Sequence, residues 1–391
     1  MIIEVGRQAK AAGALDLALG APDAPLTPPV RAAAVNAMAS DLHQYICPEG
    51  WLPLRQQLAQ AWSHRYDVAL DPETQVTITC GASEALSAVI WALLDPGDRV
   101  AIFEPFYEGH YATLALAGVQ PCPVPLDAPT WSFNPAPLVQ ALRRGAKAVL
   151  LCTPSNPCGK VFRADELASI HALCARYGAW CISDETYEAF VYDDRPPTSL
   201  LQCGLDGHVV VLGGLGKTLA ATGWRIGYVF ADAATSAAVR TVHEALTVVA
   251  PVPLQVASAW AWRDGAAHRR LAVQQAAVRR LQLVDALRTA GLSPAPPEGG
   301  LCLLAELPRP HPRGALGWAE HLIAHVGVAA APGSAFFAAA ERGQQWLRFV
   351  FNKSDATLRA AQTRLSQTSP DWLQAAAIAS PPKPSFAEFS A

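Results

Sequence analysis

Four polar side chains that could do chemistry follow apolar runs of the sequence. Asn156 follows KAVLLC, Asp184 and Tyr187 follow AWCIS, and Lys217 follows HVVVLG. If these runs are strands of an open α/β sheet, their carboxyl ends converge on one crevice, which is where ligands bind in such sheets. We therefore expect an asparagine, an aspartate, a tyrosine and a lysine to meet in one site.

This set of side chains suits one kind of ligand. A partly desolvated lysine with a lowered pKa is a nucleophile for an aldehyde. A buried carboxylate such as Asp184 requires a cation, and a protonated ring nitrogen would supply it. The predicted helix start at Ala82 and Ser83 offers free amides and a dipole that favour a phosphate. Aldehyde, ring nitrogen and phosphate together describe pyridoxal phosphate.

The segment GGLGKT also looks like a nucleotide-binding P-loop. A P-loop requires a glycine six residues before its lysine, because the loop folds its amides round the phosphates. Here that position is Val211, and the preceding apolar run is roughly the fifth strand rather than the first. The sequence therefore argues against a nucleotide triphosphatase.

A serine hydrolase is a second alternative, because the segment GASEA nearly matches the GxSxG nucleophile elbow. Ser83 would be the nucleophile, and Asp184 and His243 follow in the order of a catalytic triad. However, Ala85 replaces the last glycine of the motif, and hydrolase chemistry leaves Lys217 without a role. This alternative is therefore the weaker one.

Apolar runs alternate with helical patterns between about residues 75 and 230. This alternation is typical of a mainly parallel sheet covered by helices on both faces. We predict an α/β fold, a three-layer sandwich with a mainly parallel sheet, together with a smaller α+β domain. A long helix is predicted over residues 268–291. The predicted division is an N-terminal segment of the small domain (1–40), a large cofactor-binding domain (41–285), a small C-terminal domain (286–379) and a flexible tail (380–391).

Composition argues against several classes of partner. The 30 Lys+Arg and 33 Asp+Glu residues give a net charge of −3, and no basic run interleaves with aromatics, so we predict no nucleic-acid binding. The nine cysteines are scattered without a CxxC pair or an HExxH motif, which predicts free thiols and no metal site. No signal peptide or membrane-spanning run is evident, which predicts a cytoplasmic protein without a membrane partner.

Five motifs make the sequence similar to class I/II aminotransferases, which are fold-type I pyridoxal-phosphate enzymes. SNPCGKVF resembles the family's SNPTGKVF, SDETYE its SDEVYE, and GKTLAATGWRIGY its lysine motif with an arginine eight residues later. QYICPEGWLPLR and WLRFVF resemble its signatures near the start and end of the chain. Gly216, directly before the lysine, most resembles the branch of kynurenine, glutamine K and methionine aminotransferases.

The resemblance implies a role for each of the strand-end residues. Lys217 would form a Schiff base with pyridoxal phosphate and then move the proton between substrate and cofactor. Asp184 would keep the pyridine nitrogen protonated, which makes the ring an electron sink. Asn156 and Tyr187 would hydrogen-bond the phenolic oxygen, and Tyr107 would stack on the ring.

Further residues would bind the phosphate and the substrate. Arg348 would clamp the substrate carboxylate in a bidentate fork, with Asn156 and the backbone of Gly20 close to it. Tyr45 would reach the phosphate of a neighbouring subunit, so the resemblance also implies a homodimer. The phosphate would be held within the chain by Ala82, Ser83 and Arg225.

The implied activity is a ping-pong aminotransferase acting on an L-amino acid and a 2-oxo acid. No second arginine stands out for a dicarboxylate, so we expect neutral, aromatic or sulfur-containing amino acids. A C–S β-lyase or another fold-type I reaction would use nearly the same residues and stays open at this point.

Two features stand outside this pattern. Gly214 lies where the family usually has a serine that binds the phosphate, and a lost hydrogen bond of this kind is worth about 0.5–1.5 kcal/mol. Three histidines, His110, His171 and His243, fit no partner pattern, and we predict that they are packed or solvated.

Overall fold

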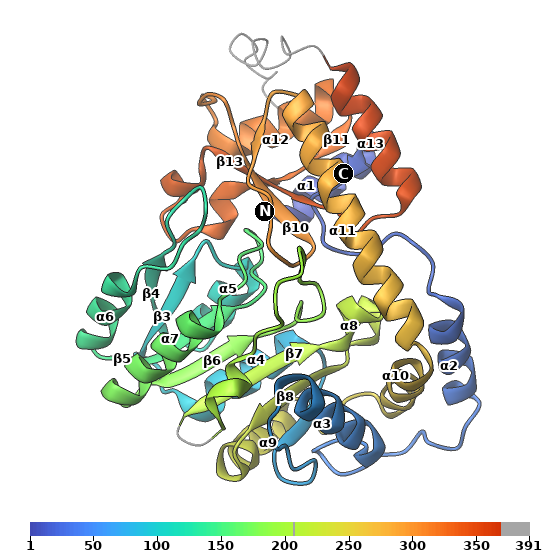
Figure 1. Cartoon of the computed structure of the whole chain (residues 1–391), viewed down its shortest axis with the longest axis vertical. Coiled ribbons are helices and arrows are strands. Elements are labelled where there is room, and N and C mark those ends of the chain that lie inside the picture. The colour runs from blue at the N-terminus through green and yellow to red at the C-terminus, as the bar shows by residue number, and fades with distance from the viewer. Residues whose placement is uncertain (206–207, 369–391) are drawn as a thin grey trace, which may run out of the picture.

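The computed structural model describes residues 1–205 and 208–368 (Figure 1). At its centre is a seven-stranded sheet of order β2-β8-β7-β6-β5-β3-β4, in which β8 alone runs antiparallel to its neighbours. This mainly parallel sheet confirms the predicted α/β class. Its strands are β2 (Val76–Thr79), β3 (Arg99–Glu104), β4 (Gln120–Pro125), β5 (Ala146–Cys152), β6 (Trp180–Asp184), β7 (Val209–Gly214) and β8 (Gly227–Ala231).

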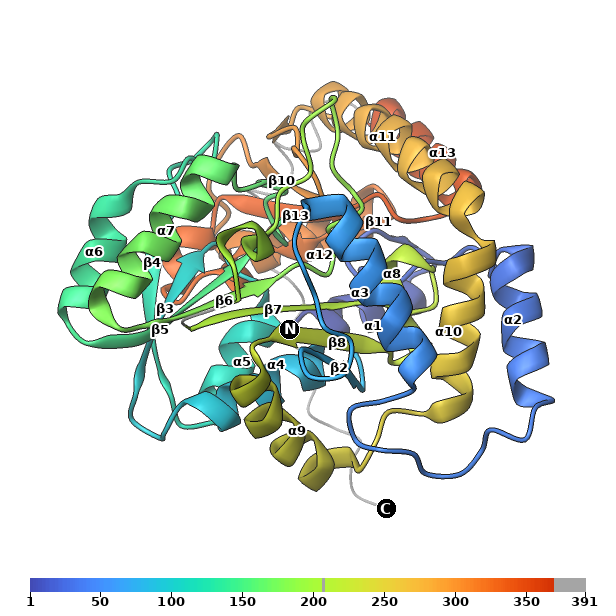
Figure 2. The same cartoon turned by 60° about the horizontal axis from the view of Figure 1, so that its bottom comes forward.

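Helices cover both faces of this sheet, which makes three layers (Figure 2). Successive residues of a strand point to opposite faces. Thus Val210 and Leu212 of β7 pack into one core with α4 and α9, whereas Val209 and Val211 pack into the core on the other face. The helices are α4 (Ala82–Leu93), α5 (Glu108–Leu116) and α9 (Ala233–Thr247) on one face, and α3 (Leu52–Tyr66), α6 (Pro135–Arg143) and α7 (Ala164–Tyr177) on the other.

A second, antiparallel sheet of order β12-β13-β10-β9 forms the core of a smaller α+β part. The N-terminus contributes to this part, because α1 contacts α12 and β1 pairs with β11. The elements are α1 (Ile2–Ala11), β1 (Leu15–Asp16), β9 (Ser293–Pro294), β10 (Cys302–Glu306), α12 (Gly314–His325), β11 (Val328–Ala329), β12 (Ala331–Pro332), β13 (Trp346–Val350) and α13 (Asp355–Gln367).

Three further helices lie on one side of the molecule, on the right in Figure 1. The predicted long helix is α11 (Ala266–Thr289), which packs against α13 and β9. Helix α2 (Pro28–Met38) packs against α10 (Val252–Asp264) of the larger part. The domain boundaries given above stay a prediction, and the predicted tail, 380–391, lies outside the described residues.

Strands β4 and β8 are absent from the sequence-based prediction. Strand β4 carries Pro121, Pro123 and Pro125, and a proline cannot donate to a strand ladder. The sheet tolerates these prolines because β4 is its edge and pairs with β3 alone. With β4 included, β7 is the sixth strand of this sheet along the chain rather than the fifth.

Within the described ranges, no helix is long and apolar enough to cross a membrane.

Candidate active site

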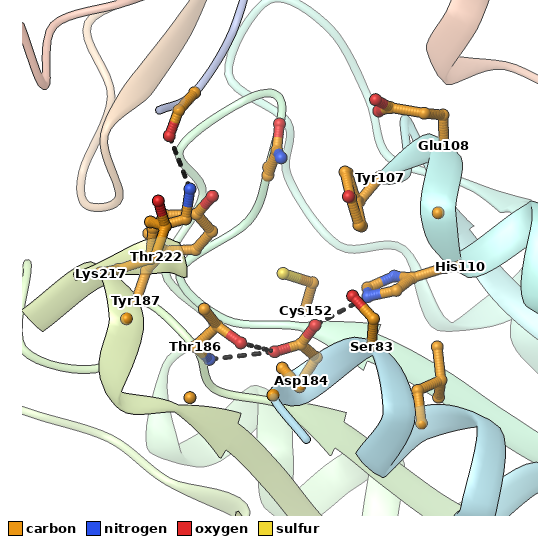
Figure 3. A pocket seen from close by; sticks show the side chains of 18 of the residues that line it. Ser83, Tyr107, Glu108, His110, Cys152, Asp184, Thr186, Tyr187, Lys217 and Thr222 are labelled. Atoms are coloured by element: carbon orange, nitrogen blue, oxygen red, sulfur yellow. Dashed lines mark hydrogen bonds and ion pairs between the residues drawn. The ribbon is translucent and has the colours of Figure 1, made fainter. Parts of the chain in front are cut away.

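A cavity of about 490 Å³ lies at the carboxyl ends of the parallel strands (Figure 3). It brings together all the predicted site residues except Tyr45, whose side chain lies on the loop before α3 and is 81% exposed. The predicted residues that line it are Gly20, Ala82, Ser83, Tyr107, Asn156, Asp184, Tyr187, Lys217, Arg225 and Arg348.

Lys217 lies on the short helix α8 (Leu215–Thr218), directly after β7. Its Nζ donates to the carbonyl of Gly20 at 2.6 Å and lies 5.8 Å from the ring centroid of Tyr187. Burial, together with the positive charge of Arg348, lowers the pKa of Lys217 to about 8. Among the described residues no carboxylate forms an ion pair with this amine. A buried amine of lowered pKa without such a partner is suited to attack an aldehyde as a nucleophile.

Asp184 ends β6, and both of its carboxylate oxygens accept hydrogen bonds (Figure 3). Oδ1 accepts from the backbone and hydroxyl of Thr186, at 3.0 and 2.6 Å, and Oδ2 lies 2.8 Å from Nε2 of His110. Burial would raise the pKa of Asp184, but the hydrogen bond and charge of His110 and the bonds from Thr186 outweigh it and lower the pKa. The carboxylate therefore stays ionised and suits a protonated ring nitrogen.

His110 is a site residue that the sequence-based prediction misses. It is 3% exposed and lies on α5, three residues after Tyr107, whose ring it meets edge-on at 5.3 Å. The prediction of a merely packed or solvated histidine is therefore incomplete, because His110 packs directly against the predicted cofactor carboxylate. The i, i+3 spacing from Tyr107 at a helix start is the signal that could have found it.

The structure does not assemble the alternative hydrolase triad. Nδ1 of His243, on α9, lies 3.1 Å from the carboxylate oxygens of Glu84, and Asp184 pairs with His110 instead. His171 is a partly buried residue of α7, away from the cavity lining.

The start of α4 forms a cradle for an anion. Gly81 precedes this helix with a φ of +81°, and a Cβ there would lie 2.5 Å from Nη2 of Arg225. Arg225 itself adopts a φ of +54°, which a non-glycine residue rarely does. Its guanidinium donates to the carbonyls of Thr222 and Cys80 at 3.2 and 3.5 Å, without a carboxylate partner among the described residues. Together with the free amides at Ala82 and Ser83, it suits a phosphate.

Arg348 supplies a second cation from β13 and is 3% exposed. Its Nη1 donates to Oδ1 of Asn156 at 3.1 Å, and its Nη2 donates to the carbonyl of Ala18. Its Nε is buried without a hydrogen-bond partner in the described part of the chain. Because such a donor is costly to leave unpaired, the guanidinium is suited to a carboxylate that enters the cavity.

Two tyrosines complete the walls of the cavity. Tyr107 caps the start of α5, and Tyr187 follows Asp184 by one turn and is 9% exposed. Burial raises the pKa of both phenols, so both stay protonated and can donate a hydrogen bond.

Within the described ranges, no group of three or more His, Cys, Asp and Glu side chains could hold a metal ion.

The three-layer fold and this lysine-centred cavity define a pyridoxal-phosphate enzyme of fold type I. The family model of aminotransferase class I and II matches residues 12–365, so the chain belongs to that family and is a pyridoxal-phosphate-dependent transferase.

Several relatives share nearly the whole chain. It is 34% identical to a probable N-succinyldiaminopimelate aminotransferase DapC of Mycobacterium tuberculosis, over 93% of this chain and 94% of the relative. It is 30% identical to human kynurenine–oxoglutarate transaminase 1, over 90% and 91%. The structure of YbdL from Escherichia coli, described as having a methionine aminotransferase function, matches with a TM-score of 0.89 at 30% identity and covers 94% of this chain and 96% of that one. These matches confirm the predicted class and its relation to the kynurenine and methionine branch.

Gly214 permits a direct test of the cofactor cradle. Its φ of −156° suits any residue, and a Cβ there would meet the amide nitrogen of Ala82 at 3.5 Å, an ordinary contact. We therefore expect Gly214→Ser to bind pyridoxal phosphate roughly 2- to 10-fold more tightly, the gain of one hydrogen bond. Equilibrium titration of the cofactor-free protein measures this, with Gly214→Ala as the matched variant that adds Cβ without the hydroxyl. Equal dissociation constants for the two variants would contradict the prediction.

Proposed function

We propose that this protein is a ping-pong aminotransferase that moves the amino group of a neutral, aromatic or sulfur-containing L-amino acid to a 2-oxo acid. The observation that carries the proposal is the placement of Lys217 and Arg348 in one cavity. A guanidinium with an unpaired Nε binds a carboxylate, and an amine with a pKa of about 8 exchanges protons near neutral pH.

The residues round the cofactor would each have a different role in the reaction. Bound pyridoxal phosphate supplies an electron sink for negative charge at the substrate Cα. Lys217 Nζ would take the proton from the substrate Cα and pass it to C4′ of the cofactor, and Arg348 would orient the substrate through its carboxylate. Asp184, fixed by His110 and Thr186, holds the proton on the ring nitrogen.

The remaining roles concern cofactor binding. Asn156 and Tyr187 would hydrogen-bond the phenolic oxygen, and Tyr107 would stack on the ring. The phosphate would be held by Ala82, Ser83 and Arg225 at the start of α4. What supports these assignments is that every one of these residues lines the same cavity.

The proposed substrate preference is based on the residues that line the cavity. Ile2, Ile3 and Leu19 line it on the side of the N-terminal segment and offer apolar surface to a side chain. The arginines of the lining are Arg225 and Arg348, and both have roles in the proposal, so neither is left to bind a second carboxylate. Two of the relatives, a kynurenine–oxoglutarate transaminase and a protein with a methionine aminotransferase function, agree with such a preference.

Two further parts of the proposal concern the assembly and the compartment. We propose a homodimer in which Tyr45, 81% exposed on its own chain, reaches the phosphate site of the partner. Exposed apolar side chains of α2 nearby, Val35 and Met38, support a subunit contact there. A cytoplasmic location agrees with the nine free cysteines.

The half-reaction tests the proposal. The cofactor-loaded protein mixed with methionine or phenylalanine, without an acceptor, should convert its near-visible absorbance to that of the amine form and release one equivalent of 2-oxo acid per site. Adding a 2-oxo acid should then restore the band. Release of pyruvate or ammonia from sulfur amino acids without an acceptor would instead indicate β-lyase chemistry, and failure to take up pyridoxal phosphate would overturn the proposal.

A further inference from the structure

One charged side chain of the cavity has no part in the functions proposed above. Glu108 is the first residue of α5 and lines the cavity next to Tyr107. Figure 3 shows both residues on the other side of the cavity from Lys217. Its Oε2 is buried and has no hydrogen-bond partner within the described ranges. A buried carboxylate oxygen without a partner is costly, so this placement calls for a ligand group.

The charge of Glu108 acts on the cavity itself. Burial raises the pKa of Tyr107, and the neighbouring Glu108 carboxylate raises it further. Cys302, beside Asn156 at 3.5 Å, has a pKa of about 11, chiefly through burial, and Glu108 also contributes to its rise. The Glu108 carboxylate is therefore close enough to influence both Tyr107 and Cys302 electrostatically.

The surroundings of Glu108 limit what it can bind. The basic residues of the lining other than His110 are Lys217, Arg225 and Arg348, and each has another role in the proposal. The lining also includes the apolar side chains Ile2, Ile3 and Leu19. Besides Asp184, which is assigned to the cofactor, Glu108 is the one carboxylate of the described lining, so a substrate side chain in this cavity would meet apolar surface and this carboxylate.

We propose that Glu108 is a specificity-determining residue that favours substrate side chains ending in a hydrogen-bond donor and disfavours those ending in a carboxylate. The inference rests on the proposed aminotransferase function and names its substrate class. It covers both halves of the reaction, since amino acid and 2-oxo acid occupy the same space. Dicarboxylic amino acids and 2-oxo acids are thus poor substrates, and amide-ended or amine-ended ones are good.

Glutamine and glutamate provide the sharpest probe, because they differ only in an amide NH₂ against a carboxylate oxygen. We expect the wild-type half-reaction, followed by cofactor absorbance, to show a kcat/KM at least tenfold higher for glutamine than for glutamate. In Glu108→Gln that ratio should fall to threefold or less, and Glu108→Asp should restore most of it. The matched control is Glu4→Gln, which removes an exposed carboxylate of α1 outside the cavity lining and should leave the ratio unchanged.

The outcomes separate this inference from the proposed function. A wild-type ratio below threefold overturns the role of Glu108 by itself, without any variant. An unchanged ratio in a folded Glu108→Gln protein that binds the cofactor overturns it as well. Failure of methionine, glutamine and glutamate alike to convert the cofactor band would instead count against the aminotransferase function.

Discussion

Replacing Lys217 with alanine should lower kcat for transamination by at least about 10³- to 10⁴-fold, the upper range for loss of a proton-transferring group. The amine is the one group of the described cavity that combines a pKa of about 8 with a position beside Tyr187 and Gly20. Its removal also abolishes the covalent attachment of the cofactor, which borohydride reduction followed by mass spectrometry measures directly.

Lys353 gives a matched control for this substitution. It is also buried, its Nζ donates to the carbonyl of Ala21 at 2.8 Å, and burial lowers its pKa, but it does not line the cavity. Lys353→Ala should keep the borohydride-stable attachment. Turnover by Lys217→Ala within tenfold of the wild type would contradict the assignment.

The pKa of Lys217 adds a dependence on pH to the same experiment. Burial disfavours the ammonium form, so at pH 7 about 10% of the amine is neutral, against about 0.03% for an ordinary lysine. Capture of pyridoxal phosphate by the cofactor-free wild type should therefore become about tenfold faster between pH 7 and pH 9 and then level off. A rate that keeps rising tenfold per pH unit above pH 9 would show an unperturbed lysine.

The sequence predicts most of the site because its residues follow parallel strands. Asn156 and Lys217 follow β5 and β7, and Asp184 ends β6. These three strands are adjacent in the sheet, so side chains at their carboxyl ends lie together at one edge of it. Buried strands in such a sheet are nearly continuous apolar runs, as in VVVLGG of β7, and are easy to recognise. Strand β4 escapes recognition because its alternating prolines argue against a strand, and only its edge position makes them acceptable.

Other parts of the site depend on contacts that no local pattern specifies. His110, on α5, contacts Asp184 at the end of β6, although these two residues lie 74 positions apart in the chain. Ile2 lines the cavity because α1 packs on the small domain, and β1 fixes it there by pairing with β11. The role proposed for Glu108 depends on the burial of its Oε2, which composition and spacing do not reveal. Tyr45 lies outside the cavity lining of its own chain, and only the proposed homodimer would bring it to a phosphate site.

Replacing Asp184 with asparagine should lower kcat/KM by about 10²- to 10³-fold, the range for loss of one preorganised electrostatic group in an active site. Asparagine keeps the shape of the side chain and can still bond Thr186, so the change removes the charge rather than the packing. The ring nitrogen then loses the carboxylate that keeps it protonated. Steady-state kinetics at saturating cofactor measures the effect, and activity within tenfold of the wild type would contradict it.

A buried carboxylate could also affect activity through folding alone, so a structural control is needed. Asp232 caps α9, where its side chain accepts from the amides of Ala234 and Thr235, and it lies outside the cavity lining. Asp232→Ala should lower the unfolding temperature, because loss of an N-cap costs about 0.5–2 kcal/mol, without a change in kcat/KM beyond about twofold. Asp184→Asn should show the reverse.

His110 contacts Asp184, so in this proposal it acts on the ring nitrogen only through that carboxylate. His110→Gln should lower kcat/KM roughly 10- to 100-fold, the value of one hydrogen bond to a charged group. His110 lowers the pKa of Asp184, so its loss raises that pKa, and the acid-side fall of activity should begin at a higher pH. If His110 works through the carboxylate, the double variant Asp184→Asn, His110→Gln should be no slower than Asp184→Asn alone. Additive losses would mean that His110 contacts the reacting groups independently.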